Sequence, residues 1–515
     1  MSGFQRILGT AKADFLERIR KFSFFAFAAI LIFAVFWFVP KPSGVTSMVI
    51  EPTRLLQASD PSWIPMSSAM CGGMLLCILG FAYIKNTVQQ DCHAGIFYWI
   101  QTSPLKRSTY VLGKFVSNLF LLLLLLGFLM AASFFMMVLH FPGQFIPLYD
   151  FFSPFLCLVP GLFFVAAFAV VTDCAPVLRK SSSLSIAIFL CFSIMILTFE
   201  SLWRINSRLL SIFDFSGFLW MRDSISNTVL AATGHPVTQI NLFTSAHRTN
   251  AQLKAVAFHG LTPSYQFLID KLILMASSLI LALLASFMLP KSEKAAASVQ
   301  KQATPKPNNA LAWIPPLHFG ITHSEALILL KDRTKLWWMT AICLWIATFF
   351  SPMDTVCSAL FPIAFAWMLP VFSKMGCLEH QTGVDSILRT MPKVPLLLTF
   401  DCWNTGLAIS LAVGFPTLLR LLFSNQIANF ISALVFVVAV PSFALFLGEW
   451  TKTNRPFEIL YLIVCYLAVN VPQLIFTGAY FTAESTVRVI GLVILTGVML
   501  FLTFTKKLAE NHQTA

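Results

Sequence analysis

The chain has few charged residues. Asp, Glu, Lys and Arg make up 11% of its 515 positions, whereas a soluble globular domain carries about 25%. Hydrophobic residues reach 57% and aromatic residues 14%, with 52 Phe among them. Because so few polar groups cannot cover a water-soluble surface, the composition excludes an ordinary soluble globule and predicts an integral membrane protein.

Sequence signatures of catalysis and nucleotide binding are also missing. The chain contains no GxxxxGK[ST] loop, no HExxH pair and no GxSxG elbow. Its 11 Cys form no CxxC pair, and several fall inside apolar runs, as small core residues do. We therefore expect no cofactor, no metal and no catalytic residue in this chain.

Ionisable residues are nearly absent from the interiors of the apolar runs, which leaves little to form an ion or proton path. The exceptions stand near the expected outer ends of spans, where we expect long side chains to snorkel to the interface. These exceptions are Asp270 with Lys271, Arg420 and Arg488.

The formal net charge of +13 could indicate a nucleic-acid partner. However, the Lys and Arg residues lie mostly in short loops between apolar runs, which is the positive-inside distribution of membrane proteins. We read the charge as topology, with no nucleic acid bound. It places both termini in the cytoplasm and the chain in the cell's inner membrane.

Apolar runs of about 18 to 22 residues, the length that a helix needs to cross a bilayer, predict the spans. We expect an all-α integral membrane protein of about twelve transmembrane helices in two six-helix repeats, with amphipathic surface and coupling helices. The halves are 1–290 and 312–515, joined by a polar cytoplasmic linker at 291–311. The expected spans are 22–40, 64–84, 117–138, 152–172, 183–200, 268–290, 336–352, 356–374, 402–423, 430–448, 458–475 and 486–505.

A polar inner segment between the second and third spans, DCHAGIFYWIQTSPLKRSTYVLGK at Asp91–Lys114, has a counterpart 288 residues later. That counterpart is EHQTGVDSILRTMP at Glu379–Pro392. Such a constant offset predicts two copies of one membrane unit, each with a short helix along the inner membrane surface. The paired positions are Asp91 and Glu379, Gly95 and Gly383, Thr102 and Thr390, and Pro104 and Pro392.

These segments offer a surface that a separate motor subunit could grip, and a solvated or lipid-facing surface helix explains them equally well. Loops after the fourth span of each half, Asp173–Ser183 and Glu449–Glu458, could add smaller contacts through Arg179 and Arg455. Charges suited to ion pairs at the rim of such an interface are Asp91, Lys106, Arg107, Glu379, Arg389 and Lys393.

Each half also has a short sequence that follows its fifth span, FDFSG at Phe213–Gly217 and LIFTG at Leu474–Gly478. In the first half a long extracytoplasmic stretch, 201–267, surrounds this sequence, whereas the second half returns to the membrane almost at once. We expect the first half to contribute most of the outer mass, which would then cap an exit.

Taken together, these features resemble the permease subunits of ABC-2-type ATP-binding cassette transporters in which two six-span halves are fused. The resemblance covers nearly the whole chain and rests on the two inner segments, APVLRK at 175–180, FDFSG and TNRPFE followed by IFTG. It implies an exporter driven by two separately encoded nucleotide-binding subunits, which hold the ATP and Mg²⁺. It also implies that the inner segments dock on those subunits as coupling helices. The residues expected in this coupling are Asp91, Gly95, Pro104, Lys106, Arg107, Glu379, Gly383, Arg389, Pro392, Arg179 and Arg455.

Two other classes of function stay open. One is a membrane-embedded enzyme acting on a lipid or peptide, with Asp214, His235, Asp270 or His259 at its outer face. The other is an ion-coupled secondary transporter, which the scarcity of buried carboxylates disfavours. The second inner segment also departs from the first, with Met391 where the first has Ser103, so it could bind a different motor subunit.

Overall fold

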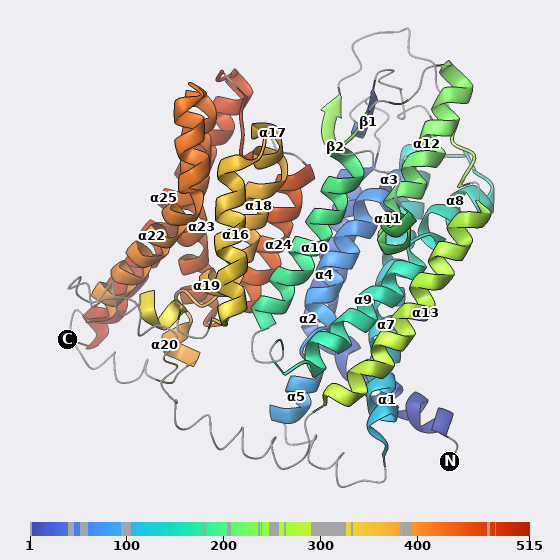
Figure 1. Ribbon diagram of the computed structural model, residues 1–515, viewed down its shortest axis with the longest axis horizontal. Coiled ribbons are helices and arrows are strands. Elements are labelled where there is room, and N and C mark those ends of the chain that lie inside the picture. Colours follow the sequence, from blue (N-terminus) through green and yellow to red (C-terminus); the bar gives the residue numbers. More distant parts are fainter. Residues whose placement is uncertain are drawn as a thin grey trace. The chain divides into compact units, whose positions relative to one another are not determined.

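A computed structural model of the whole chain gives the fold (Figure 1). It divides into two compact units, one of Met1–Ser185 with Ile196–Gln302 and one of Ile186–Met195 with Ala303–Ala515. The predicted linker 291–311 lies outside the described residues. These residues are 3–39, 46–51, 60–93, 105–176, 178, 182–202, 208–234, 237, 239–246, 257–261, 264–289, 326–330, 333–381, 383, 394–470, 474–478 and 480–514.

The first unit is built mainly of helices. Its second predicted span consists of α3 (Trp63–Ser67), a π-helical turn η2 (Ser68–Gly72) and α4 (Gly73–Ile84), and this span is almost wholly buried. The other helices of this unit are α1 (Gly3–Ile19), α2 (Phe22–Phe38), α5 (Thr87–His93), α7 (Arg107–His140), α8 (Leu148–Leu156), α9 (Val159–Cys174), α11 (Arg208–Phe213), α12 (Phe218–Thr233) and α13 (Tyr265–Met288). Helix α10 (Ser182–Leu202) contributes its middle residues to the second unit.

Glycines let neighbouring helices approach the buried span of the first unit. A Cβ at Gly72 would lie 2.8 Å from the Leu129 side chain of α7, and one at Gly80 would lie 2.6 Å from Leu122. Small residues at such contacts are how membrane helices pack closely, because burial against lipid supplies little hydrophobic driving force. The long helices α7, α9 and α13 also pack on one another (Figure 1).

The second unit is also built of helices. Its helices are α16 (Lys335–Phe350), α17 (Met353–Thr355), the π-helical turn η4 (Val356–Leu360), α18 (Phe361–Trp367), α19 (Leu369–Phe372), α20 (Leu378–Gln381), α22 (Val394–Phe423), α23 (Ile427–Thr451), α24 (Arg455–Asn470) and α25 (Ala483–Thr514). Here α22, α23 and α25 pack on one another (Figure 1). Most of α25 is exposed, as expected for a helix facing lipid.

Eight helices among the described residues are long and apolar enough to cross a membrane, or nine if α1 and α2, which meet at a 73° bend, form one broken span. The chain is therefore a multi-pass helical membrane protein. Helix α10 and the two 16-residue helices α16 and α24 coincide with further predicted spans. The number twelve stays a prediction.

One small sheet accompanies the helices, and the sequence analysis did not foresee it. Strand β1 (Thr46–Glu51) pairs antiparallel with β2 (Gln239–Ala246), with an irregular register between Thr46 and Met48. The pairing joins the connection that follows the first predicted span to the long stretch 201–267. Alternating polar and apolar residues in β2, such as Gln239, Ile240 and Asn241, were the available signal.

Candidate functional site

The first inner segment begins with α5, and a carboxylate from another helix holds its first turn. Asn86, with a φ of 71°, turns the chain between α4 and α5. The Asp173 carboxylate of α9 accepts hydrogen bonds from the backbone N–H of Asn86 at 2.9 Å and of Thr87 at 2.8 Å. These N–H groups open a helix and have no intrahelical partner, so an external carboxylate stabilises them.

Asp91 points back into the protein. Its carboxylate lies 2.7 Å from the Lys114 ammonium and accepts a 2.6 Å hydrogen bond from the Tyr110 hydroxyl, both on α7. Lys114 also bonds the Asp14 carboxylate of α1 at 2.6 Å. The side chains of Asp14, Asp91 and Lys114 are nearly buried, with 8 to 13% of their surface exposed. Lys114 therefore joins the inner segment to the N-terminal helix.

The network continues along α1. The Arg18 guanidinium pairs with Asp14 and donates a 2.7 Å hydrogen bond to the Asn118 side chain of α7. Burial alone would raise the pKa of Asp14, but the charges of Arg18 and Lys114 together with the Lys114 and Ser117 hydrogen bonds lower it below its usual value. The carboxylates of Asp14 and Asp91 are thus balanced by two cations.

Two other residues predicted for the first inner segment are exposed. Lys106 and Arg107 are exposed at the start of α7, where they are accessible to a partner. Gly95, Pro104 and Arg179 lie outside the described residues.

The second inner segment begins with α20. Glu379 is half-buried in this helix, and Gly383 is exposed with a φ of 74°. Arg455 is half-buried at the first position of α24. Arg389 and Pro392 lie outside the described residues.

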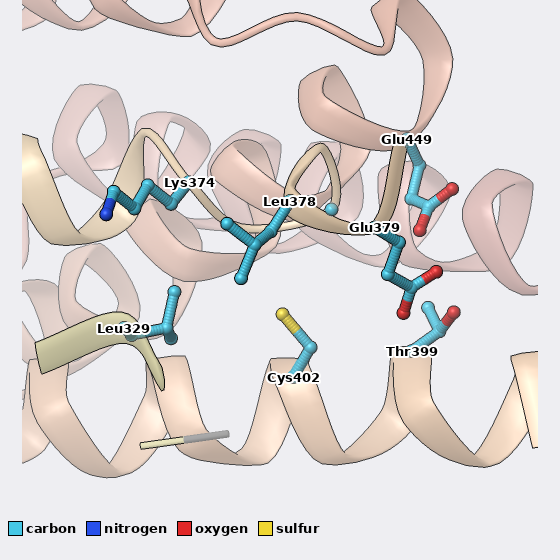
Figure 2. Close-up of a pocket in the computed structure, with 8 residues that line it drawn as sticks. Leu329, Lys374, Leu378, Glu379, Thr399, Cys402 and Glu449 are labelled. Carbon is cyan, nitrogen blue, oxygen red and sulfur yellow. The ribbon is translucent and has the colours of Figure 1, made fainter. Parts of the chain in front are cut away.

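A cavity of about 30 Å³ lies between α20 and α22. Figure 2 shows Glu379 pointing toward Thr399 of α22, with Glu449 on the same side and Lys374 extending away from both carboxylates. This volume holds about two or three water molecules, since each needs roughly 10 to 15 Å³ of such space. It is far smaller than a substrate site of about 300 Å³ or more.

Glu449 is a buried acid near the C-terminal end of α23. Its carboxylate lies 3.0 Å from the Lys507 ammonium of α25 and 3.2 Å from that of Lys452. Its neighbour Gly448 packs so closely on the preceding turn that a Cβ there would lie 2.0 Å from the Met375 carbonyl oxygen. The end of α23 thus supports the turn that leads into α20.

At the opposite end of α9 from Asp173, the FDFSG sequence caps α12. The Asp214 carboxylate accepts hydrogen bonds from the backbone N–H of Phe218 and of Leu219, both at 3.1 Å, and lies 3.6 Å from the Lys271 ammonium. Lys271 is 4% exposed and Asp270 is fully buried, where it accepts a 2.9 Å hydrogen bond from Ser211. The expectation that these two residues snorkel to the interface is wrong, because the buried Asp214 offers Lys271 an ionic partner inside.

The LIFTG sequence of the second unit also docks on a membrane helix. The Ser432 hydroxyl of α23 donates to the Ile475 carbonyl, and the Gly478 N–H donates to the Asn429 side chain at 2.7 Å. Of the residues predicted for an outer-face enzyme, Asp214 and Asp270 link α11, α12 and α13 of the first unit. His259 is exposed, and His235 lies outside the described residues.

The sequence analysis missed several residues that build the inner sites: Asp14, Lys114, Asp173 and Glu449. Part of their signal was present, since Lys114, Asp173 and Glu449 are charges within three residues of the expected inner end of a predicted span, where loops usually take such charges. Which charges fold inward depends on partners distant in sequence.

No set of three or more His, Cys, Asp or Glu side chains suited to a metal occurs among the residues that the structure describes. Fold and sites together define a multi-pass helical membrane protein with buried ionic clusters where its membrane helices meet α5 and α20. No family model matches the chain, and no characterised protein or solved structure is significantly similar to it.

Proposed function

We infer that the chain is the transmembrane permease subunit of an ATP-driven exporter of the ABC-2 type. In this proposal twelve spans form two six-helix repeats in the cell's inner membrane, with both termini in the cytoplasm. Two separate ATP-binding cassette subunits hold ATP and Mg²⁺ and dock on the inner segments. Their closure would move the two halves as rigid bodies and pass cargo outward.

The observation that carries the proposal is how firmly the inner segments are supported. A segment that receives a power stroke must transmit force, and α5 is bonded to α9 through Asp173 and to α7 through Asp91. The start of α20 is packed on the end of α23. A free surface helix that only rests on lipid needs no such buried ionic anchors, which cost desolvation unless well paired.

A repeated architecture supports the division into two similar halves. The π-helical turns η2 and η4 begin at Ser68 and Val356, which are 288 residues apart, as are Asp91 and Glu379. Each turn interrupts the helix that precedes an inner segment. In each unit the third, fourth and sixth predicted spans also pack together, as α7, α9 and α13 or as α22, α23 and α25.

The test is reconstitution. The purified chain in lipid nanodiscs should hydrolyse no ATP, and ATPase activity should appear when a cassette protein encoded beside it is co-expressed. Lipid or peptide turnover by the chain alone, or ion-driven flux without ATP, would overturn the proposal in favour of the enzyme or the secondary transporter.

Substitution of the paired glycines tests the coupling role itself. We expect Gly95→Val combined with Gly383→Val to reduce cassette ATPase stimulation by tenfold or more, because a φ of 74° at Gly383 disfavours a branched side chain. Gly497→Ala is the matched control, since a Cβ at Gly497 meets no atom within 4 Å. Full stimulation in the double variant would contradict a coupling role for these segments.

A further inference from the structure

The turn into each inner segment lies against the inner end of a membrane helix that carries a buried acid. In the first unit this turn contains Asn86, and in the second it contains Gly376. Both residues adopt a left-handed backbone, with φ values of 71° and 70°. The acids are Asp173 of α9 and Glu449 of α23, each 2% exposed.

Asp173 is placed against the preference of its own helix. It lies one residue before the end of α9, where the helix dipole disfavours a negative charge. The same carboxylate lies at the start of α5, where the dipole favours it. Its Oδ1 accepts from Asn86 N–H, and its Oδ2 accepts from Thr87 N–H and, at 3.3 Å, from the Thr87 hydroxyl. The Asp173 carboxylate therefore stabilises α5 and not α9.

Glu449 acts by packing. A Cβ on Gly376 would lie 3.1 Å from the Glu449 Cγ and 2.8 Å from the Leu445 carbonyl oxygen, so only glycine fits between the turn and α23. Lys507 and Lys452 hold the Glu449 carboxylate from the other side. The side chain is thus fixed over the residue that begins the approach to α20.

We propose that Asp173 and Glu449 are positioning residues for the two inner segments, fixing α5 to α9 and α20 to α23. The functional role of this positioning rests on the proposed function. If a partner subunit displaces α5 or α20, the attached helix α9 or α23 moves with it. The local claim, that these acids decide how rigidly the segments are held, is independent of any partner.

Amide hydrogen exchange of the full chain in nanodiscs tests the local claim. Asp173→Ala should accelerate exchange in the peptide covering Thr87–His93 by about tenfold or more, because the first N–H groups of a short helix lose a charged acceptor. Asp173→Asn, which keeps one acceptor oxygen, should restore part of the protection. Glu449→Ala, which removes the Cγ that packs on Gly376, should accelerate exchange at Leu378–Gln381 in the same way.

Asp150→Ala is the matched control, because Asp150 is a buried acid near the outer end of the same unit. It should leave α5 exchange unchanged. Unchanged exchange of α5 in Asp173→Ala would overturn the inference. Equal acceleration of exchange in α5, α12 and α13 would also overturn it, because that pattern would show a loss of overall stability and no local positioning.

Failure of the proposed function gives a different result. If the wild-type chain neither binds nor stimulates a co-expressed cassette protein, the exporter proposal falls while the exchange pattern stands. If the wild-type complex forms, Asp173→Ala should keep cassette binding within a few-fold but lower ATPase stimulation by about tenfold, with Asp173→Asn in between. Stimulation equal to wild type would overturn the positioning role.

Discussion

The Ser410 hydroxyl of α22 donates a 2.6 Å hydrogen bond to the Val437 carbonyl of α23. In a regular helix that carbonyl would accept from the residue four positions later, but position 441 is a proline and has no N–H. A neighbouring helix therefore supplies the missing donor, as membrane interiors require. The Trp345 indole does the same for the Ala412 carbonyl, which Pro416 leaves without a donor.

This relationship predicts a double-mutant cycle. Ser410→Ala should destabilise the protein by about 0.6 to 1.7 kcal/mol, the range measured for hydrogen bonds between membrane helices. In a Pro441→Ala background the helix regains its own donor, so Ser410→Ala should cost little. Unfolding in mixed detergent micelles measures both values. Equal costs in the two backgrounds would show that Ser410 serves another purpose.

A pair of glycines in the first unit predicts opposite responses to one substitution. A Cβ at Gly161 of α9 would lie 1.6 Å from the Phe215 carbonyl oxygen, so Gly161→Ala must displace the FDFSG turn. We expect it to lower the free energy of unfolding by about 1 to 3 kcal/mol or more. Gly127→Ala in α7, where nothing lies within 4 Å, should be neutral or stabilising. Equal melting temperatures of the two variants would contradict this prediction.

The Lys114 cluster predicts a large cost for removing one cation. Lys114→Met leaves the buried Asp14 and Asp91 carboxylates short of one positive charge and should destabilise by about 3 to 5 kcal/mol. Lys21→Met is the control, because the Lys21 and Glu17 pair is 45% and 60% exposed and contributes about 0 to 1 kcal/mol. Thermal unfolding in detergent reports both, and a loss no larger than that of the control would mean that the cluster is not stabilising.

The lowered pKa of Asp14 predicts acid sensitivity. Because its folded pKa lies below the usual value of 3.8, its ionised form stabilises the fold above that value. The contribution is lost as the pH falls from about 4 through the folded pKa. The melting temperature, measured from about pH 6 to about pH 3, should therefore fall less steeply in Asp14→Asn than in the wild type. Parallel curves would exclude this origin.

The sequence alone determined the class of the protein and most of its helices. Apolar runs and scarce charge leave a chain no stable state in water, so membrane spans can be read from local composition. The constant offset of 288 between Asp91 and Glu379 also predicted a repeat, and the π-helical turns have the same spacing. Composition did not reveal the β1 and β2 pairing, because it joins residues almost 200 positions apart.

Only the tertiary structure decided which charges turn inward. Asp91 was expected at the rim of a partner interface, yet its carboxylate is bonded to Lys114, and Lys271 was expected to snorkel, yet it pairs with Asp214. Sequence periodicity records the face of a helix on which a residue lies. Whether an oppositely charged side chain lies against that face depends on which helices become neighbours, and packing alone decides that.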